Sequence, residues 1–214
     1  MREAIGLAVT VMLVSADMCR AADPQAGRQL VMRGNDTGAT ACVACHGADG
    51  AGNAAAGFPR LAGLDARYLE KQLLDFQRGT RNDPIMQPVA KALSDSEAAA
   101  VAAYYAAQTA PADDEAKADP ALVARGERLA LAGLWERTVP ACVSCHGPRG
   151  LGVGAHFPAL AGQHAGYIAK QLDAWRNGTR SNDPQQLMKG VAERLPEEDI
   201  AAVSAYFASL EPAR

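Results

Sequence analysis

Two short motifs of the same form, one hundred residues apart, constrain this chain more than any other feature. Each has two cysteines separated by two residues and a histidine directly after the second cysteine: ACVACHG at 41–47 and ACVSCHG at 141–147. The similarity extends further, because FPRLAGLDARYLEKQLLDFQRGTRNDP at 58–84 matches FPALAGQHAGYIAKQLDAWRNGTRSNDP at 157–184. A chain of 214 residues with this duplication is expected to fold as two similar domains.

Composition marks the ends of these two domains. Residues 1–21 combine a short apolar run with a small-residue ending, which is typical of a cleaved secretory signal peptide; a retained membrane anchor is the alternative. Residues 109–120 (TAPADDEAKADP) are rich in Ala, Pro and acidic residues and lack apolar periodicity, so we interpret them as a linker. The first domain is then expected at 22–108 and the second at 121–214, both in the periplasm.

The charge of the chain is nearly balanced, with 21 basic and 24 acidic residues and no long run of either sign. Nucleic acid is therefore not expected as a partner, whereas small molecules or proteins are. Only 5% of the residues are aromatic, so each domain has few large side chains with which to build a core. A bound group is expected to fill that space.

Each half contains segments with a helical pattern, and none has a strand pattern over a useful length. The first helix of each half is predicted to start at an Asp-Pro pair (Asp23, Asp119), where Asp can cap the helix and Pro can occupy its first turn. Another follows Ser94, because SDSE is a capping-box pattern. The helix after Ser94 is predicted to end at 108. The other predicted helices span 66–77 in the first half and 165–176 and 196–210 in the second. This predicts an all-α fold whose long loops need a group to wrap around.

The spacing of cysteine and histidine in the motifs is that of c-type haem attachment. Cysteines at positions i and i+3 can form thioether bonds to a haem, while the histidine at i+4 reaches the iron from one face. A thioredoxin-like dithiol has no use for the histidine, and a zinc site would have to join loops one hundred residues apart. We therefore predict two covalently bound haem c groups. The predicted attachment residues are Cys42, Cys45, Cys142 and Cys145, and the predicted iron ligands are His46 and His146.

The second ligand of each iron is predicted to be a methionine. Met32 aligns with Leu131 and so does not repeat, whereas Met86 and Met188 are each followed three residues later by Val-Ala. Methionine and histidine are the usual sixth ligands of haem iron in electron carriers, so we assign Met86 and Met188 as iron ligands; ordinary packing near the haem is the alternative. An iron closed on both faces favours electron transfer over substrate chemistry.

Two further histidines are not expected to bind iron. His156 and His164 align with Gly57 and Asp65 of the first half, neither of which is a haem ligand. We expect both histidines on the surface.

Taken together, these residues make the chain resemble the diheme cytochrome c4 family, in which two class I cytochrome c domains are fused. The resemblance covers nearly the whole mature length and rests on the CxxCH motifs, the FPxLAG and YxxKQL stretches, the NDP turns and the two methionines. It implies periplasmic electron transfer, with the propionate edges of the haems close together at the domain interface. It also implies redox proteins as partners: a quinol-oxidising complex or another donor, and a terminal oxidase or a similar acceptor.

The resemblance further implies roles for residues outside the motifs. The carbonyl groups of Pro59 and Pro158 should accept a hydrogen bond from the histidine of each motif. A glycine in each domain should let the first helix cross closely over an aromatic residue on the last helix. The crossing pairs are Gly27 with Tyr105 and Gly126 with Phe207. The methionine loop departs from the repeat, since it is two residues longer in the second half.

Other functions compete with that of a free electron carrier. The same domain pair serves as the cytochrome subunit of a flavocytochrome c sulfide dehydrogenase, and this reading stays open as the alternative. Diheme peroxidases and thiosulfate dehydrogenases also use two CxxCH motifs, but the former need an iron that opens and some of the latter use a cysteine ligand. The mature chain has no cysteine outside the motifs, so we expect no intrinsic enzyme activity and no small-molecule substrate. Peripheral membrane association is left open.

Overall fold

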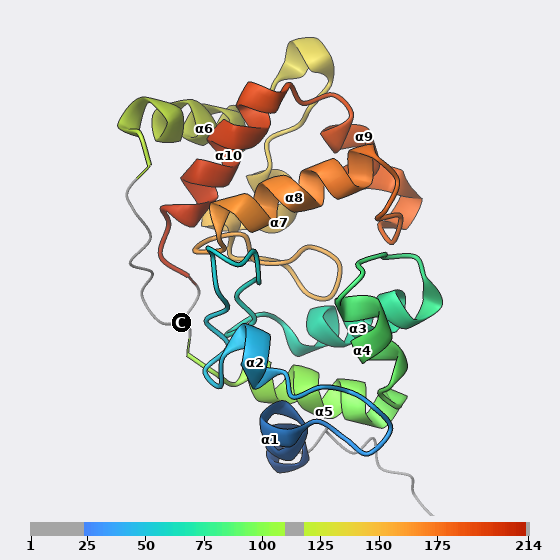
Figure 1. Cartoon of the computed structure of the whole chain (residues 1–214). Coiled ribbons are helices and arrows are strands. Elements are labelled where there is room, and N and C mark those ends of the chain that lie inside the picture. The colour runs from blue at the N-terminus through green and yellow to red at the C-terminus, as the bar shows by residue number, and fades with distance from the viewer. Residues whose placement is uncertain (1–23, 110–117, 213–214) are drawn as a thin grey trace, which may run out of the picture.

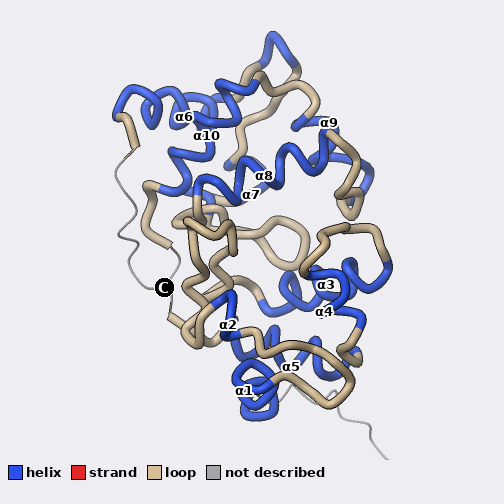
Figure 2. Tube along the Cα trace, viewed as in Figure 1, coloured by secondary structure: helices blue, strands red, loops and turns tan. Residues whose placement is uncertain are grey.

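The computed structural model describes residues 24–109 and 118–212, which form helices joined by long loops (Figure 1, Figure 2). The first domain contains α1 (Pro24–Arg33), α2 (Val43–His46), α3 (Ala66–Arg78), α4 (Met86–Lys91) and α5 (Asp95–Ala106). The second contains α6 (Pro120–Ala132), α7 (Val143–His146), α8 (Ala165–Arg176), α9 (Leu187–Ala192), α10 (Glu197–Ala208) and the 3-10 turns η1 (Trp135–Arg137), η2 (Pro148–Gly150) and η3 (Pro184–Gln186).

The predicted all-α architecture is confirmed for this part of the chain. No β-strand forms within the described ranges, where single pairs of residues make isolated bridges. None of the helices described is long and apolar enough to cross a membrane. The predicted signal peptide and most of the predicted linker lie outside the described residues.

Local sequence signals account for where the main helices begin and end. The carboxylate of Asp119 accepts the N–H of Ala121 at the start of α6, as predicted, while Asp23 lies outside the described residues. Ser94 and Glu97 form the predicted capping box at the start of α5. Gly79 ends α3 in the left-handed conformation, with φ of 76°. Helices α5 and α10 end at 106 and 208, two residues before the predicted ends.

The helices pack as two equivalent groups, one per domain, which lie one above the other in Figure 1. In the first, α1 and α3 pack against α5; in the second, α6 and α8 pack against α10. In each group one further helix, α3 or α8, buries an apolar stripe. The buried stripe residues are Tyr68, Leu69 and Phe76 on α3 and Ile168, Leu172 and Trp175 on α8. The loops between the helices cover the region where the domains meet.

The close crossing of the first and last helices occurs at residues other than those predicted. A Cβ atom on Gly27 would overlap the carbonyl group of Ala100, and one on Gly126 would overlap that of Ala202. The prediction that these glycines lie against Tyr105 and Phe207 was wrong. Tyr105 and Phe207 come five residues after Ala100 and Ala202, so their side chains lie about 140° further round the helix. The residues that they contact instead are Gly50 and Gly150, in the loops after the cysteine motifs.

Candidate haem-binding site

A single cavity of about 1030 Å³ runs between the two domains. All eight predicted site residues line it: Cys42, Cys45, His46, Met86, Cys142, Cys145, His146 and Met188. The rest of the lining is mostly apolar and comes from helices α3, α4, α5, α8, α9 and α10 and from the loops between them. Pockets that bind one drug-sized molecule have volumes of roughly 300–1,000 Å³, so this cavity is at the upper limit for one ligand. The structure thus brings both motifs and both methionines to one space.

Each cysteine motif forms one turn of helix, α2 or α7. Positions i, i+3 and i+4 lie on the same face of a helix, which directs the thiols and the imidazole of each motif toward the cavity. Burial raises the pKa of Cys42 and of Cys142 to about 11. A thiol with such a pKa is a poor nucleophile at neutral pH. The burial of these two sulfur atoms therefore argues against a reactive dithiol and suits a thioether.

The histidine of each motif is oriented by one backbone carbonyl. His46 Nδ1 lies 3.1 Å from the Pro59 oxygen, and His146 Nδ1 lies 2.8 Å from the Pro158 oxygen, as the resemblance implied. Because a carbonyl only accepts hydrogen bonds, Nδ1 carries the proton and Nε2 keeps a free lone pair. Burial also lowers the pKa of both imidazoles, although the carbonyl contacts oppose this. Each ring is thus neutral at pH 7 and suited to bind iron through Nε2.

The two methionines lie at the start of short helices, and Asp side chains fix the loops before them. Asp83 accepts the N–H groups of Ile85 and Met86, each at 3.0 Å. In the second domain the longer loop forms η3, with Gln185 and Gln186 at φ of 55° and 58°. The turn at these two left-handed residues accommodates the two extra residues of the loop, and Met188 still lines the cavity. By contrast, Met32 is 43% exposed on α1 and does not line the cavity.

The two additional histidines differ from each other. His156 is exposed, as predicted. The prediction that His164 is a surface residue was wrong, since it is buried and its Nε2 lies 3.1 Å from the Ala51 oxygen of the first domain. Alignment of the halves compares each domain as if it were isolated. Position 164 faces the other domain, and no feature within one repeat shows this.

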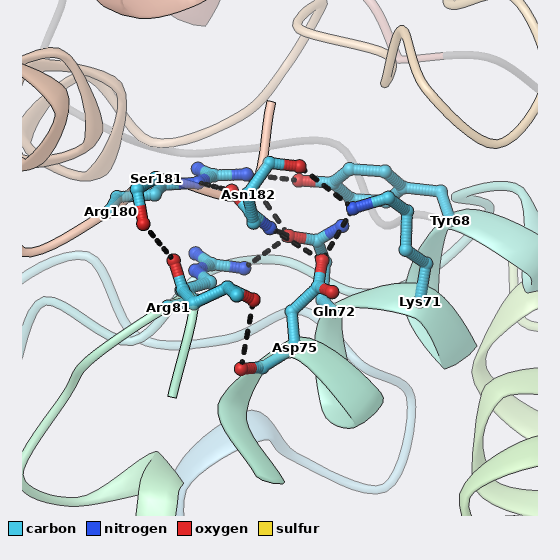
Figure 3. A network of polar contacts seen from close by, with 9 residues as sticks. Tyr68, Lys71, Gln72, Asp75, Arg81, Arg180, Ser181 and Asn182 are labelled. Carbon is cyan, nitrogen blue, oxygen red and sulfur yellow. Dashed lines mark hydrogen bonds and ion pairs between the residues drawn. The ribbon is translucent and has the colours of Figure 1, made fainter. Parts of the chain in front are cut away.

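Two buried arginines at equivalent positions of the repeat, Arg81 and Arg180, were not predicted from the sequence. Arg81 donates to Tyr167 Oη at 2.6 Å and to Gln171 Oε1 at 2.7 Å in the other domain. Arg180 donates to Gln72 Oε1 at 3.0 Å, and Figure 3 shows it beside Arg81 in one polar network. The tripeptide GTR, which occurs in both halves, was the available signal.

The backbones of the same segments join the domains. Arg81 and Arg180 form an antiparallel bridge, with hydrogen bonds of 2.8 Å from Asn82 N to Thr179 O and from Ser181 N to Thr80 O. Each domain therefore presents the same surface to the other, as in an isologous dimer interface. This joint sets how the two halves of the cavity face each other.

The charge of this interface calls for an anionic ligand. Neither Arg81 nor Arg180 forms an ion pair with a carboxylate in the described part of the chain, although both line the cavity. Burial, and then the nearby charge of Arg81, lower the pKa of Arg180. Buried like charges are costly without a compensating anion. Trp175 Nε1 is also buried there without a hydrogen-bond partner among the described residues.

These features fit haem, which has a flat apolar ring and two carboxylates at one edge. Apolar residues of each domain can enclose the ring, and the two arginines and Trp175 can meet the carboxylates where the domains join. The apolar lining includes Leu73, Val89 and Leu93 in the first domain and Leu172, Val191 and Leu195 in the second. When bound, such a group supplies an iron that gains and loses single electrons.

Comparisons with known proteins agree with this chemistry. The cytochrome c family model matches residues 27–107 and 123–211. The thiosulfate dehydrogenase electron acceptor of Stutzerimonas stutzeri (strain A1501) is 51% identical over 95% of this chain and 94% of its own length. The cytochrome c4 of Pseudomonas aeruginosa is 46% identical over 80% of this chain and 85% of its own length.

Two solved structures share the fold at substantial sequence identity. Reduced recombinant cytochrome c4 from Pseudomonas stutzeri has a TM-score of 0.79 and 40% identity, and the match covers 89% of this chain and all of that one. A thiosulfate dehydrogenase from Marichromatium purpuratum has a TM-score of 0.82 and 45% identity, over 88% of this chain and 40% of that longer one. The chain belongs to the diheme cytochrome c4 family of electron-transfer proteins, with covalently bound haem c in its two cytochrome c domains.

Proposed function

We propose that this protein is a periplasmic electron carrier that accepts electrons from a thiosulfate dehydrogenase and delivers them to a terminal oxidase or a similar acceptor. The donor is inferred from the relative in Stutzerimonas stutzeri, which is 51% identical over almost the whole chain and is called a thiosulfate dehydrogenase electron acceptor. A segment similar to this chain also forms 40% of a solved thiosulfate dehydrogenase chain. Thiosulfate is thus the substrate of the partner enzyme, and this chain takes up only the electrons.

The observation that carries the proposal is the shared cavity, because it brings two redox sites to one interface. In the first domain we assign thioether attachment to Cys42 and Cys45 and iron ligation to His46 and Met86. The equivalent residues of the second domain are Cys142, Cys145, His146 and Met188. The fixed tautomer of the histidines and the placement of both methionines on the cavity support these ligand sets. Six-coordinate iron leaves no open position for a substrate.

The interface supports rapid exchange of electrons between the haems. Arg81 and Arg180 pair with each other and both line the cavity, where they can hold the carboxylates of both haems. The two porphyrin edges would then meet at the domain joint. An electron that enters at one haem can leave from the other, which allows the donor and the acceptor to dock on different domains.

The periplasmic location rests on the predicted signal peptide at 1–21 and its cleavage. We also propose domain limits of 22–108 and 121–214, with a linker at 109–120. Mass spectrometry of the exported protein tests the cleavage of the signal peptide and the attachment of the haems. It should give a chain lacking the leader and carrying the added mass of two haems.

Stopped-flow spectroscopy tests the proposed donor. The oxidised protein is mixed with a purified thiosulfate dehydrogenase and thiosulfate, and growth of the reduced haem band is followed. We expect reduction of both haems only when enzyme and thiosulfate are both present. Full reduction by dithionite without any reduction by the enzyme and thiosulfate would contradict the proposed donor. A flavoprotein that co-purifies tightly with the cytochrome would point instead to the flavocytochrome alternative.

A further inference from the structure

One peptide unit links the predicted haem ligand of the first domain to a side chain of the second. The carbonyl group of Pro59 lies 3.1 Å from His46 Nδ1, and the N–H of Arg60, in the same peptide, donates to Gln163 Oε1 at 2.9 Å. Arg60 and Gln163 are both buried. A continuous path of two hydrogen bonds therefore runs from the imidazole, through the peptide, to the second domain.

The amide of Gln163 is held firmly in this position. Its Nε2 donates to the Arg60 oxygen at 2.9 Å, so the side chain pairs with both polar backbone groups of Arg60, as a neighbouring strand would. Its Oε1 also accepts the N–H of His164 at 3.1 Å. Only one orientation of the amide satisfies these donors and acceptors together.

The two domains differ at this point. The residues of the repeat that correspond to Gln163 and Arg60 are Leu64 and Ala159. Leucine has no polar side-chain atom, so the first domain cannot return the same contact to the Pro158 peptide of the second. The path thus acts on one of the two predicted haem sites.

We propose that Gln163 is a positioning residue that lowers the reduction potential of the first haem across the domain interface. Acceptance of the Arg60 N–H by Gln163 polarises the peptide, because hydrogen bonds in a chain strengthen one another. The Pro59 oxygen becomes a better acceptor for the His46 proton, which makes the imidazole a more basic ligand. A more basic ligand favours ferric iron. This inference rests on the proposed ligation of the first haem by His46.

Two substitutions with opposite expected effects test the proposal. Gln163→Leu introduces the residue of the first repeat and removes the acceptor, so the potential of the first haem should rise. We expect a two- to tenfold change in its reduction equilibrium, about 18 to 59 mV for one electron. The NMR signal of the His46 Nδ1 proton in the reduced protein should move upfield, whereas that of His146 should not move. Gln163→Glu keeps an acceptor of greater charge and should shift both readouts of the first site the other way.

His164→Leu is the matched control, because it removes the interdomain contact with Ala51 and leaves the Pro59 peptide untouched. It should leave both readouts of the first site near their wild-type values. Equal shifts of both haems in Gln163→Leu, or shifts like those of the control, would overturn the proposal. Where Gln163→Leu does not assemble, the NMR signal of the His46 Nδ1 proton in Gln163→Glu decides, because a buried negative charge lowers a haem potential even without a hydrogen-bonded path. If the first haem of the wild-type protein lacks the spectrum of histidine and methionine ligation, the proposed ligand set itself is rejected. That result is distinct from failure of the proposal for Gln163.

Discussion

Arg81 and Arg180 form an antiparallel backbone bridge with each other, and the guanidinium of each reaches a tyrosine hydroxyl group of the opposite domain. The two residues occupy the same position of the repeat, so a duplicated sequence has become a nearly symmetric interface within one chain. Their charges lie at the cavity that both haem sites share. The joint between the domains and the proposed contact between the haems are therefore the same structure.

Removal of one of these charges should lower the haem potentials. A buried positive charge favours the ferrous state, which is the less positive one, so Arg180→Leu is expected to make reduction harder, most strongly for the nearest haem. The change also breaks buried hydrogen bonds to Gln72 and Gln171 and should cost about 1–3 kcal/mol of unfolding free energy. Potentiometric titration and thermal unfolding measure the two effects.

Arg176→Leu is the control for Arg180→Leu. Arg176 lies on the same segment of the second domain but forms a partly exposed ion pair with Asp173. Its loss should change the stability and the potentials little, since exposed ion pairs contribute about 0–1 kcal/mol. Unaltered potentials in Arg180→Leu would show that the guanidinium does not face the haems.

The methionine assignment predicts a change confined to one site. In Met188→His the second haem would gain a nitrogen ligand in place of sulfur, which lowers its potential, because a thioether favours ferrous iron. The weak sulfur-to-iron absorption of that haem should disappear, while the first haem keeps its own. Met32→His is the control, since Met32 is exposed on α1 and away from the cavity. Spectra and potentials that do not change in Met188→His would reject Met188 as a ligand.

Local signals in the sequence predicted most of the framework, and contacts between the domains account for most of what was missed. The capping box at Ser94 depends on neighbours a few residues away, so one sequence was sufficient to find it. The spacing within each motif was likewise sufficient to propose its cysteines and histidine as haem-binding residues. Burial of Arg81 and of His164 depends on the other domain. No periodicity within one repeat records how two domains pack, and a buried arginine contradicts the usual expectation for that residue type.

The capping box at the start of α5 predicts a stability difference that depends on pH. Ser94→Ala removes the side-chain acceptor of the Glu97 N–H and should cost about 1 kcal/mol at neutral pH. The Ser94 backbone N–H, and then Asn35 and the Ser94 hydroxyl, lower the pKa of Glu97. Because the folded pKa lies below the usual one, this contribution is complete above the usual pKa and is lost as the pH falls through the folded value. Ser94→Ala keeps the backbone N–H but loses the hydroxyl group, which donates to Glu97 at 2.9 Å. The difference between wild type and Ser94→Ala should thus narrow in acid only by the contribution of that one hydrogen bond, as measured by denaturant unfolding. A difference that stays constant down to low pH would show that the Ser94 hydroxyl group does not donate to the Glu97 carboxylate.

The close approach of α6 and α10 predicts that one glycine tolerates no side chain. A Cβ on Gly126 would overlap the carbonyl group of Ala202, so Gly126→Ala must push the helices apart and should cost about 1–3 kcal/mol. Gly166→Ala is the matched control on α8, where a Cβ would meet nothing within 4 Å. At that helical position the change should stabilise the protein by roughly 0.4–1 kcal/mol, because alanine loses less backbone entropy on folding. Thermal unfolding of the two variants should therefore shift in opposite directions, and equal shifts would contradict the crossing geometry.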